Sequence, residues 1–267
     1  MATTKRAATK KTAGKAAGKK GPAPSVRKSG GNTPKAEALG RAHLIVKYTH
    51  DSARAFMDAF RAVRERRGAT VGTSTDEEQD LLRAMLVMTA AGLDGALKQI
   101  IRDTLPAIVN ADRDALAELE TFVSRQLRGE VEPVGAPAPS KFLARVLVAK
   151  SQQSQVIEEY ILDLTGSSLQ SADELFRAAK ALGVKPAEVA INKDELKPIF
   201  QIRNKIIHEL DINFDHVKRN RQTRSQKEMC KHANRLLEIG EKLIAAVDSR
   251  LRPTRRCTGR GQRASFL

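Results

Sequence analysis

Apolar residues along most of this chain recur three and four positions apart, the spacing that places them on one face of an α-helix. Between Pro34 and about Arg67 the positions that follow this rule are Leu44, Ile45, Tyr48, Phe56, Phe60 and Val63. No stretch alternates apolar and polar residues over the length of a strand. The pattern therefore predicts an all-α protein whose main body is a helical bundle of long helices.

A second, longer helix is expected to begin near Thr75 and to end before Pro106. Thr75 and Glu78 have the spacing of a capping box, and proline lacks the backbone N–H that continues a helix. Small residues interrupt the apolar side of this helix at Gly92 and Gly95. Because glycine weakens an exposed helix, these two positions predict close contact with a neighbouring helix.

The rest of the chain predicts shorter helices followed by one long final helix. The expected segments are a helix over 112–128, a loop over 129–139, a helix from Ser140 through Ile161, a capped helix from Ser171 to Gly183, a turn over 186–192, a helical segment from Asp194, and a final helix over 223–251. We expect the short helices to be held by the long ones, since a bundle core is built from facing helices.

Charge is concentrated at the two ends of the chain. Of the formal net charge of +16, residues 1–35 carry +10, residues 253–267 carry +4, and residues 36–252 carry the remaining +2. The first segment has one large aliphatic residue, Val26, so little can offset the entropy of ordering it. We therefore expect two disordered basic tails on either side of one helical domain. The tails either contact nucleic acid non-specifically through its phosphates or serve only to keep the protein in solution.

Several classes of protein are disfavoured by composition. The two cysteines, Cys230 and Cys257, fit no metal-ligand spacing, which indicates a reducing compartment, no disulfide framework and no metal site. No apolar run approaches the ~20 residues that span a bilayer, and the Lys-rich leader has neither a signal-peptide core nor the Arg-rich amphipathic pattern of a transit peptide. No glycine-rich phosphate loop is present. We expect a cytoplasmic protein without a cofactor.

The segment from Arg203 to His208 is the strongest candidate for chemistry. Its sequence is Arg-Asn-Lys-Ile-Ile-His, and none of the other four histidines has an arginine five positions earlier. Asn204 and His208 lie four apart and share a helical face. Arg203 and His208 are five apart, about 140° around a helix of 3.6 residues per turn. If these two side chains act together, either the helix ends between them or a second chain completes the site.

This segment resembles the signature of the HEPN superfamily, an Arg followed by a polar residue and then a His after four to six intervening positions. The apolar stretch around Asp94 is similar to the second core helix of such domains, where an acidic residue is often found. The resemblance implies a HEPN-like helical bundle over about 36–252 and a metal-independent endoribonuclease that acts as a toxin or in antiviral defence. It also implies a homodimer that brings two motifs together, with RNA as substrate and an antitoxin or defence-system protein as a further partner.

The residue types suit RNA cleavage without a metal. Histidine, with an ordinary pKa of ~6.5, suits His208 to accept the proton of the ribose 2′-hydroxyl. Arginine stays charged and offers a planar fork to phosphate oxygens, which suits Arg203 to stabilise the developing charge. Asn204 is expected to orient the histidine or the phosphate, and Lys205 to add positive charge.

A dense basic run lies just downstream, and its candidate RNA-binding residues are Lys218, Arg219, Arg221 and Arg224. Other interpretations stay open. The basic run is otherwise a solvated loop, and Arg203 is otherwise the partner of an acid such as Glu209 or Asp211. Two further functions also stay open: a non-catalytic HEPN-like module in which the same residues bind RNA or a partner, and a protein that associates with nucleic acid through its basic tail.

Overall fold

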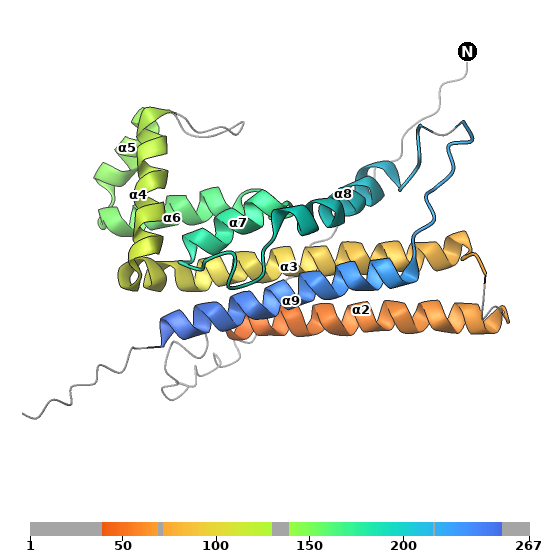
Figure 1. Ribbon diagram of the computed structural model, residues 1–267. Helices are drawn as coiled ribbons and strands as arrows, with labels where there is room; N and C mark the ends of the chain where they lie inside the picture. The colour runs from red at the N-terminus through yellow and green to blue at the C-terminus, as the bar shows by residue number, and fades with distance from the viewer. Residues whose placement is uncertain (1–38, 69–71, 130–138, 216, 253–267) are drawn as a thin grey trace, which may run out of the picture. The chain divides into compact units, whose positions relative to one another are not determined.

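The computed structural model describes residues 39–68, 72–129, 139–215 and 217–252, and these residues form an all-α bundle (Figure 1). The helices are α2 (Gly40–Arg66), α3 (Asp76–Ala111), α4 (Arg113–Arg128), α5 (Pro139–Val148), α6 (Gln152–Thr165), α7 (Ala172–Ala181), α8 (Lys193–Glu209) and α9 (Gln226–Leu251). The prediction of an all-α fold is confirmed. Both predicted tails, the start of the first predicted helix and the residues 130–138 of the predicted loop lie outside the described residues.

Three long helices, α2, α3 and α9, lie side by side and enclose the main core (Figure 1). The central one is α3, whose buried side chains include Leu86, Leu97, Ile100 and Ile101. By length and composition α3 is also the one described helix that would be able to cross a membrane. It contains an apolar stretch of 18 residues with a mean hydropathy of 1.3. Half of that apolar stretch is buried inside the protein, as expected for a helix that others pack around.

The prediction that glycines on this helix mark a close contact is confirmed most clearly at Gly92. A Cβ atom added to Gly92 would lie 1.9 Å from Oγ1 of Thr49 on α2, which is far inside van der Waals contact. The Thr49 hydroxyl is itself held, because it donates a hydrogen bond of 2.7 Å to the Ile45 carbonyl. The absence of a side chain at Gly92 therefore lets α2 and α3 approach each other.

Gly92→Ala is expected to destabilise the protein by about 1–3 kcal/mol, because the added methyl group overpacks the α2–α3 contact. Gly95→Ala is the matched control on the same helix, since its added Cβ would lie 3.7 Å from Ile45, an ordinary contact. There the gain in helix propensity should stabilise by up to about 1 kcal/mol. Urea unfolding of both variants measures the difference, and equal midpoints would show that the contact is not tight.

The shorter helices α4, α6, α7 and α8 pack on α3, and α5 packs on α4 and α6. Helices α4, α5, α6 and α7 contact one another, with the edge-on rings of Phe122 and Phe142 and the ring of Tyr160 at their centre. Helix α8 packs on α3 and α7. It runs toward the end of the bundle at which α3 begins, where the chain then crosses to α9 (Figure 1). The motif from Arg203 to His208 lies in the last two turns of α8.

The helix boundaries differ from the predicted ones in three places. Pro106 does not end the second helix, because α3 continues through it to Ala111. The single helix predicted from Ser140 is broken between Val148 and Gln152, where Ser151 caps a new helix by accepting a hydrogen bond from the backbone N–H of Ser154. The last helix begins at Gln226 rather than near 223, because the preceding residues are bound to α3. The capping box of Thr75 and Glu78 is confirmed.

Candidate functional site

Helix α8 has a polar start and a sharp end. The side chain of Asn192 accepts a hydrogen bond of 2.9 Å from the backbone N–H of Asp194, and the acids of the first turn suit the positive end of the helix. Leu210 ends the helix in the left-handed conformation, with φ of 50°. The buried residues of α8 are Leu196, Ile199, Phe200 and Ile206. They fix which face of the helix is turned toward α3.

Arg203 lies on that inward face, since it is four residues after Ile199 and three before Ile206, both of which are buried. It is half-buried, and one arm of the guanidinium, Nη1, donates a hydrogen bond of 2.9 Å to Oδ1 of Asn204. Burial lowers the pKa of Arg203, while the negative charge of Asp94 on α3 opposes this effect. Within the described residues Arg203 makes no ion pair, so neither Glu209 nor Asp211 neutralises it.

His208 lies on the outer side of α8. It is exposed, as are Asn204 and Lys205, and within the described residues its ring makes no hydrogen bond. The predicted angle of about 140° between Arg203 and His208 therefore persists, because both belong to one continuous helix. Within a single chain, one of the two catalytic candidates faces α3 and the other faces outward.

The segment after α8, described over residues 210–215 and 217–224, is bound to the start of α3 by a buried ion-pair network. Asp211 is fully buried and has a positive φ of 60°. Its carboxylate accepts two hydrogen bonds from Arg224, of 2.5 and 2.9 Å, and one of 3.2 Å from Nε of Arg83. Arg83 also donates to the carbonyl of Gln222 at 2.7 Å. We call this segment the post-α8 loop. Because it starts at the last turn of α8, its attachment to α3 holds the end of the motif.

Two of the four predicted RNA-binding cations belong to this network. The side chain of Arg224 is only 14% exposed because of its pair with Asp211. Arg221 donates hydrogen bonds to Asp80 at 3.1 Å and to the Leu210 carbonyl at 3.0 Å. The geometry gives both arginines a structural contact that the sequence did not reveal, because their partners lie more than ten residues away along the chain.

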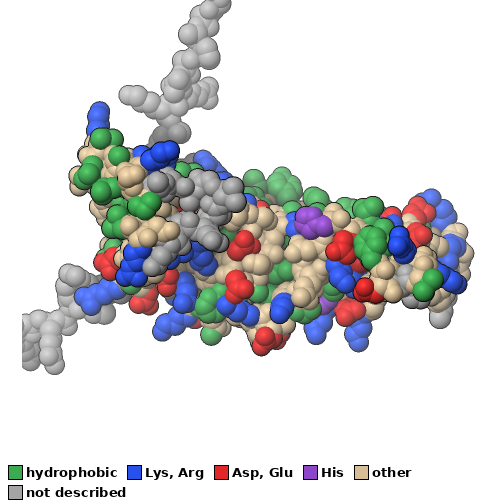
Figure 2. Space-filling view, turned by 90° about the horizontal axis from the view of Figure 1, so that it is seen from above, with side chains coloured by type: hydrophobic (Ala, Val, Ile, Leu, Met, Phe, Trp, Pro, Cys, Tyr) green, Lys and Arg blue, Asp and Glu red, His purple; other side chains and the backbone are tan. Residues whose placement is uncertain are grey.

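The other two, Lys218 and Arg219, are exposed on the same loop, and Arg219 has a positive φ of 46°. They bring positive charge close to the end of α8. On the face that Figure 2 presents, Lys and Arg side chains are interspersed with Asp and Glu.

Acid is expected to weaken the attachment of this loop. The hydrogen bond from Arg221 holds the pKa of Asp80 below its ordinary value, with Arg83 adding to the effect and burial opposing it. Since the folded-state pKa is lowered, Asp80 contributes stability that is present above ~3.9, the ordinary value, and is lost as the pH falls through the lower folded value. The contribution should stay below about 1 kcal/mol, because water screens exposed pairs. Urea midpoints between pH 7 and pH 3 should fall more steeply for the wild type than for Asp80→Asn; parallel curves would contradict this.

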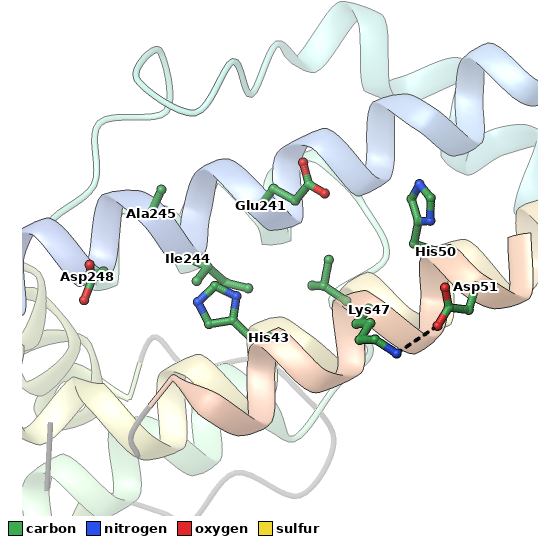
Figure 3. A pocket seen from close by; sticks show the side chains of 9 residues that line it. His43, Lys47, His50, Asp51, Glu241, Ile244, Ala245 and Asp248 are labelled. Atoms are coloured by element: carbon green, nitrogen blue, oxygen red, sulfur yellow. Dashed lines mark hydrogen bonds and ion pairs between the residues drawn. The ribbon is translucent and has the colours of Figure 1, made fainter. Parts of the chain in front are cut away.

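A groove between α2 and α9 gathers other titratable side chains. His43 and His50 come from α2, and Glu241 and Asp248 come from α9, as Figure 3 shows. The groove has a volume of about 530 Å³. No group of three or more His, Cys, Asp or Glu side chains among the described residues is arranged to hold a metal ion.

Cys230 and His232 lie two residues apart on α9. Cys230 contacts the sulfur of Met57 at 3.4 Å, and burial raises the pKa of its thiol. Since the thiolate is the nucleophilic form, this environment does not activate it. Burial lowers the pKa of His232, because it disfavours the charged form of the ring.

No family model, curated protein or solved structure matches this chain.

Proposed function

We propose that this protein is a HEPN-like, metal-independent endoribonuclease that acts as a homodimer. His208 accepts the proton of the ribose 2′-hydroxyl, and Arg203 stabilises the charge that builds on the phosphate. Asn204 orients the Arg203 guanidinium, to which it is hydrogen-bonded. Lys205 adds positive charge beside the site. A toxin or an antiviral-defence effector is the biological role that best suits such an enzyme.

The observation that carries the proposal is that Arg203 is half-buried and makes no ion pair within the described residues. An arginine that faces a neighbouring helix is usually paired, because a buried charge is costly without a partner. Among the residues that the structure describes, the guanidinium has only the neutral Asn204 amide as a hydrogen-bond partner, and its Nε is buried without one. A phosphate oxygen would supply the missing acceptor, and a planar fork is the shape that binds it well.

The second chain is supported by the surface beside His208. Four large apolar side chains are exposed in succession at the end of α8 and in the post-α8 loop, and these are Ile207, Leu210, Phe214 and Val217. Contiguous exposed apolar residues of this kind mark interaction sites. A two-fold pairing through this surface would bring the ends of the two copies of α8 together. We propose that the histidine of one chain then completes the site of the arginine of the other.

The test uses a single-stranded RNA and a DNA of the same sequence, incubated with full-length protein in EDTA. Cleavage of RNA alone is expected, with a 2′,3′-cyclic phosphate on one product and a free 5′-hydroxyl on the other, because the attacking group is the 2′-hydroxyl. End-group analysis of the products checks this. Binding of RNA without cleavage would instead support a non-catalytic HEPN-like binding module, and equal cleavage of DNA would exclude the proposed chemistry.

A further inference from the structure

A second cavity lies between the first half of α8 and the first half of α9. Its volume is about 980 Å³, within the range of about 300–1,000 Å³ that small-molecule sites occupy. Pro198 and Ile199 of α8 are apolar residues of its lining, and Lys227, Lys231 and His232 of α9 are polar ones. An apolar surface with a few converging polar groups is the usual composition of a ligand site.

The two carboxylates in this cavity are already paired with two cations, Arg235 and Lys242. The carboxylates belong to Glu195 and Glu238, and both accept hydrogen bonds from Arg235, at 2.7 and 2.9 Å. The same guanidinium donates to the Ala190 carbonyl at 2.9 Å. Arg235 thus ties α9 to α8 and to the turn before it. Together with Lys242 it balances the charge of the two acids, which therefore do not favour a cationic ligand.

The positive charge that remains is unpaired. Lys227 and Lys231 lie four residues apart on one face of α9, are exposed, and make no hydrogen bond or ion pair within the described residues. His232 beside them has a buried Nε2 without a hydrogen-bond partner. A buried polar atom without a partner is uncommon in a folded protein and calls for an explanation. Two free ammonium groups next to such a ring favour an anionic ligand.

We propose that this cavity binds a small phosphate-bearing molecule with an apolar, planar body, of the size of a mononucleotide. Lys227 and Lys231 hold the phosphate, and the base rests against Pro198 and Ile199. The site is separate from the proposed catalytic one, because it faces α9 whereas His208 faces away from the bundle. Since both sites share α8, a bound nucleotide also ties the first half of that helix to α9.

The experiment measures binding of AMP, adenosine and inorganic phosphate to the full-length protein, by calorimetry and by thermal unfolding at about 0.15 M salt. AMP should bind and raise the unfolding temperature, while adenosine and phosphate should each bind at least about tenfold more weakly. This result does not depend on RNA cleavage, so it separates the present proposal from the proposed function.

Two variants locate the binding. Lys227→Glu combined with Lys231→Glu should weaken AMP binding by at least about tenfold. The matched control is Lys197→Glu combined with Lys150→Glu, which reverses two exposed charges outside the cavity and should leave binding unchanged. Asn234→Trp, at an exposed position of the lining, should fill the cavity and also abolish binding.

Three results would overturn the proposal. If AMP does not bind, or binds no better than inorganic phosphate, then Pro198 and Ile199 do not bind the base. Adenosine that binds as well as AMP would remove the role of the lysines. Equal AMP affinity in the wild type and in the Lys227→Glu, Lys231→Glu protein would place the binding elsewhere, for example on the basic tails.

Discussion

A mixture of Arg203→Ala and His208→Ala chains is expected to regain about a quarter of the wild-type rate of RNA cleavage. Each variant alone should lose about 10²–10⁴-fold, because a proton acceptor or a charge stabiliser is missing from every site. The recovery follows from symmetry. If each site takes its arginine from one chain and its histidine from the other, a mixed dimer has one complete site and one empty site. About half of the dimers are mixed after random exchange, and each carries half of the normal sites.

The angle on α8 is the reason for expecting this result. Arg203 faces α3 and His208 faces outward on the same continuous helix, so a single chain does not direct both at one phosphate. If the site were formed within one chain, every chain in the mixture would lack one group and activity would stay near the background. Lys197→Ala, on the exposed surface of α8, serves as the control and should cleave like the wild type. The rates are measured with labelled RNA in EDTA after unfolding and refolding the mixed chains together.

Asp211→Asn should destabilise the folded protein by about 3 kcal/mol, the low end of the range for removing one partner of a buried pair. The carboxylate is fully buried and bound by both Arg224 and Arg83, and the side chain of Arg83 is only 3% exposed. Asparagine keeps the shape of the side chain and tolerates the left-handed backbone of this position. The variant therefore isolates the loss of charge. Urea or thermal unfolding at pH 7 measures the change.

The control for this prediction is Asp215→Asn, on the same loop but exposed, where a change of less than about 0.5 kcal/mol is expected. A similarly small change at Asp211 would mean that the network does not hold the loop. The substitution should also reduce RNA cleavage in protein that is still folded, because the backbone N–H groups of Leu210 and Asp211 both bind the Lys205 carbonyl and so join the network to the motif.

The sequence indicated the motif on α8 but not its surroundings. Spacing alone placed Arg203 and His208 about 140° apart, and the uninterrupted helix keeps them so. The ion pairs of Arg221 and Arg224 were not foreseeable, since Asp80 lies 141 residues from Arg221 along the chain. A basic run looks the same in a sequence whether its cations face solvent or are bound to distant acids.

Local features of the sequence determined where the helices form. Three- and four-residue spacing of apolar side chains, together with the capping residues of α3 and α7, decides where a chain becomes helical, because these interactions reach no further than one turn. Gly92 also predicted a close contact, because glycine destabilises the interior of a helix unless a neighbour leaves no room for a side chain. Tertiary structure alone decided which helix Gly92 would meet, which arginines Asp211 would bind, and that a cavity would remain between α8 and α9. Those outcomes depend on pairs of residues that are far apart in the chain, whose contact energies become available only after the helices have packed.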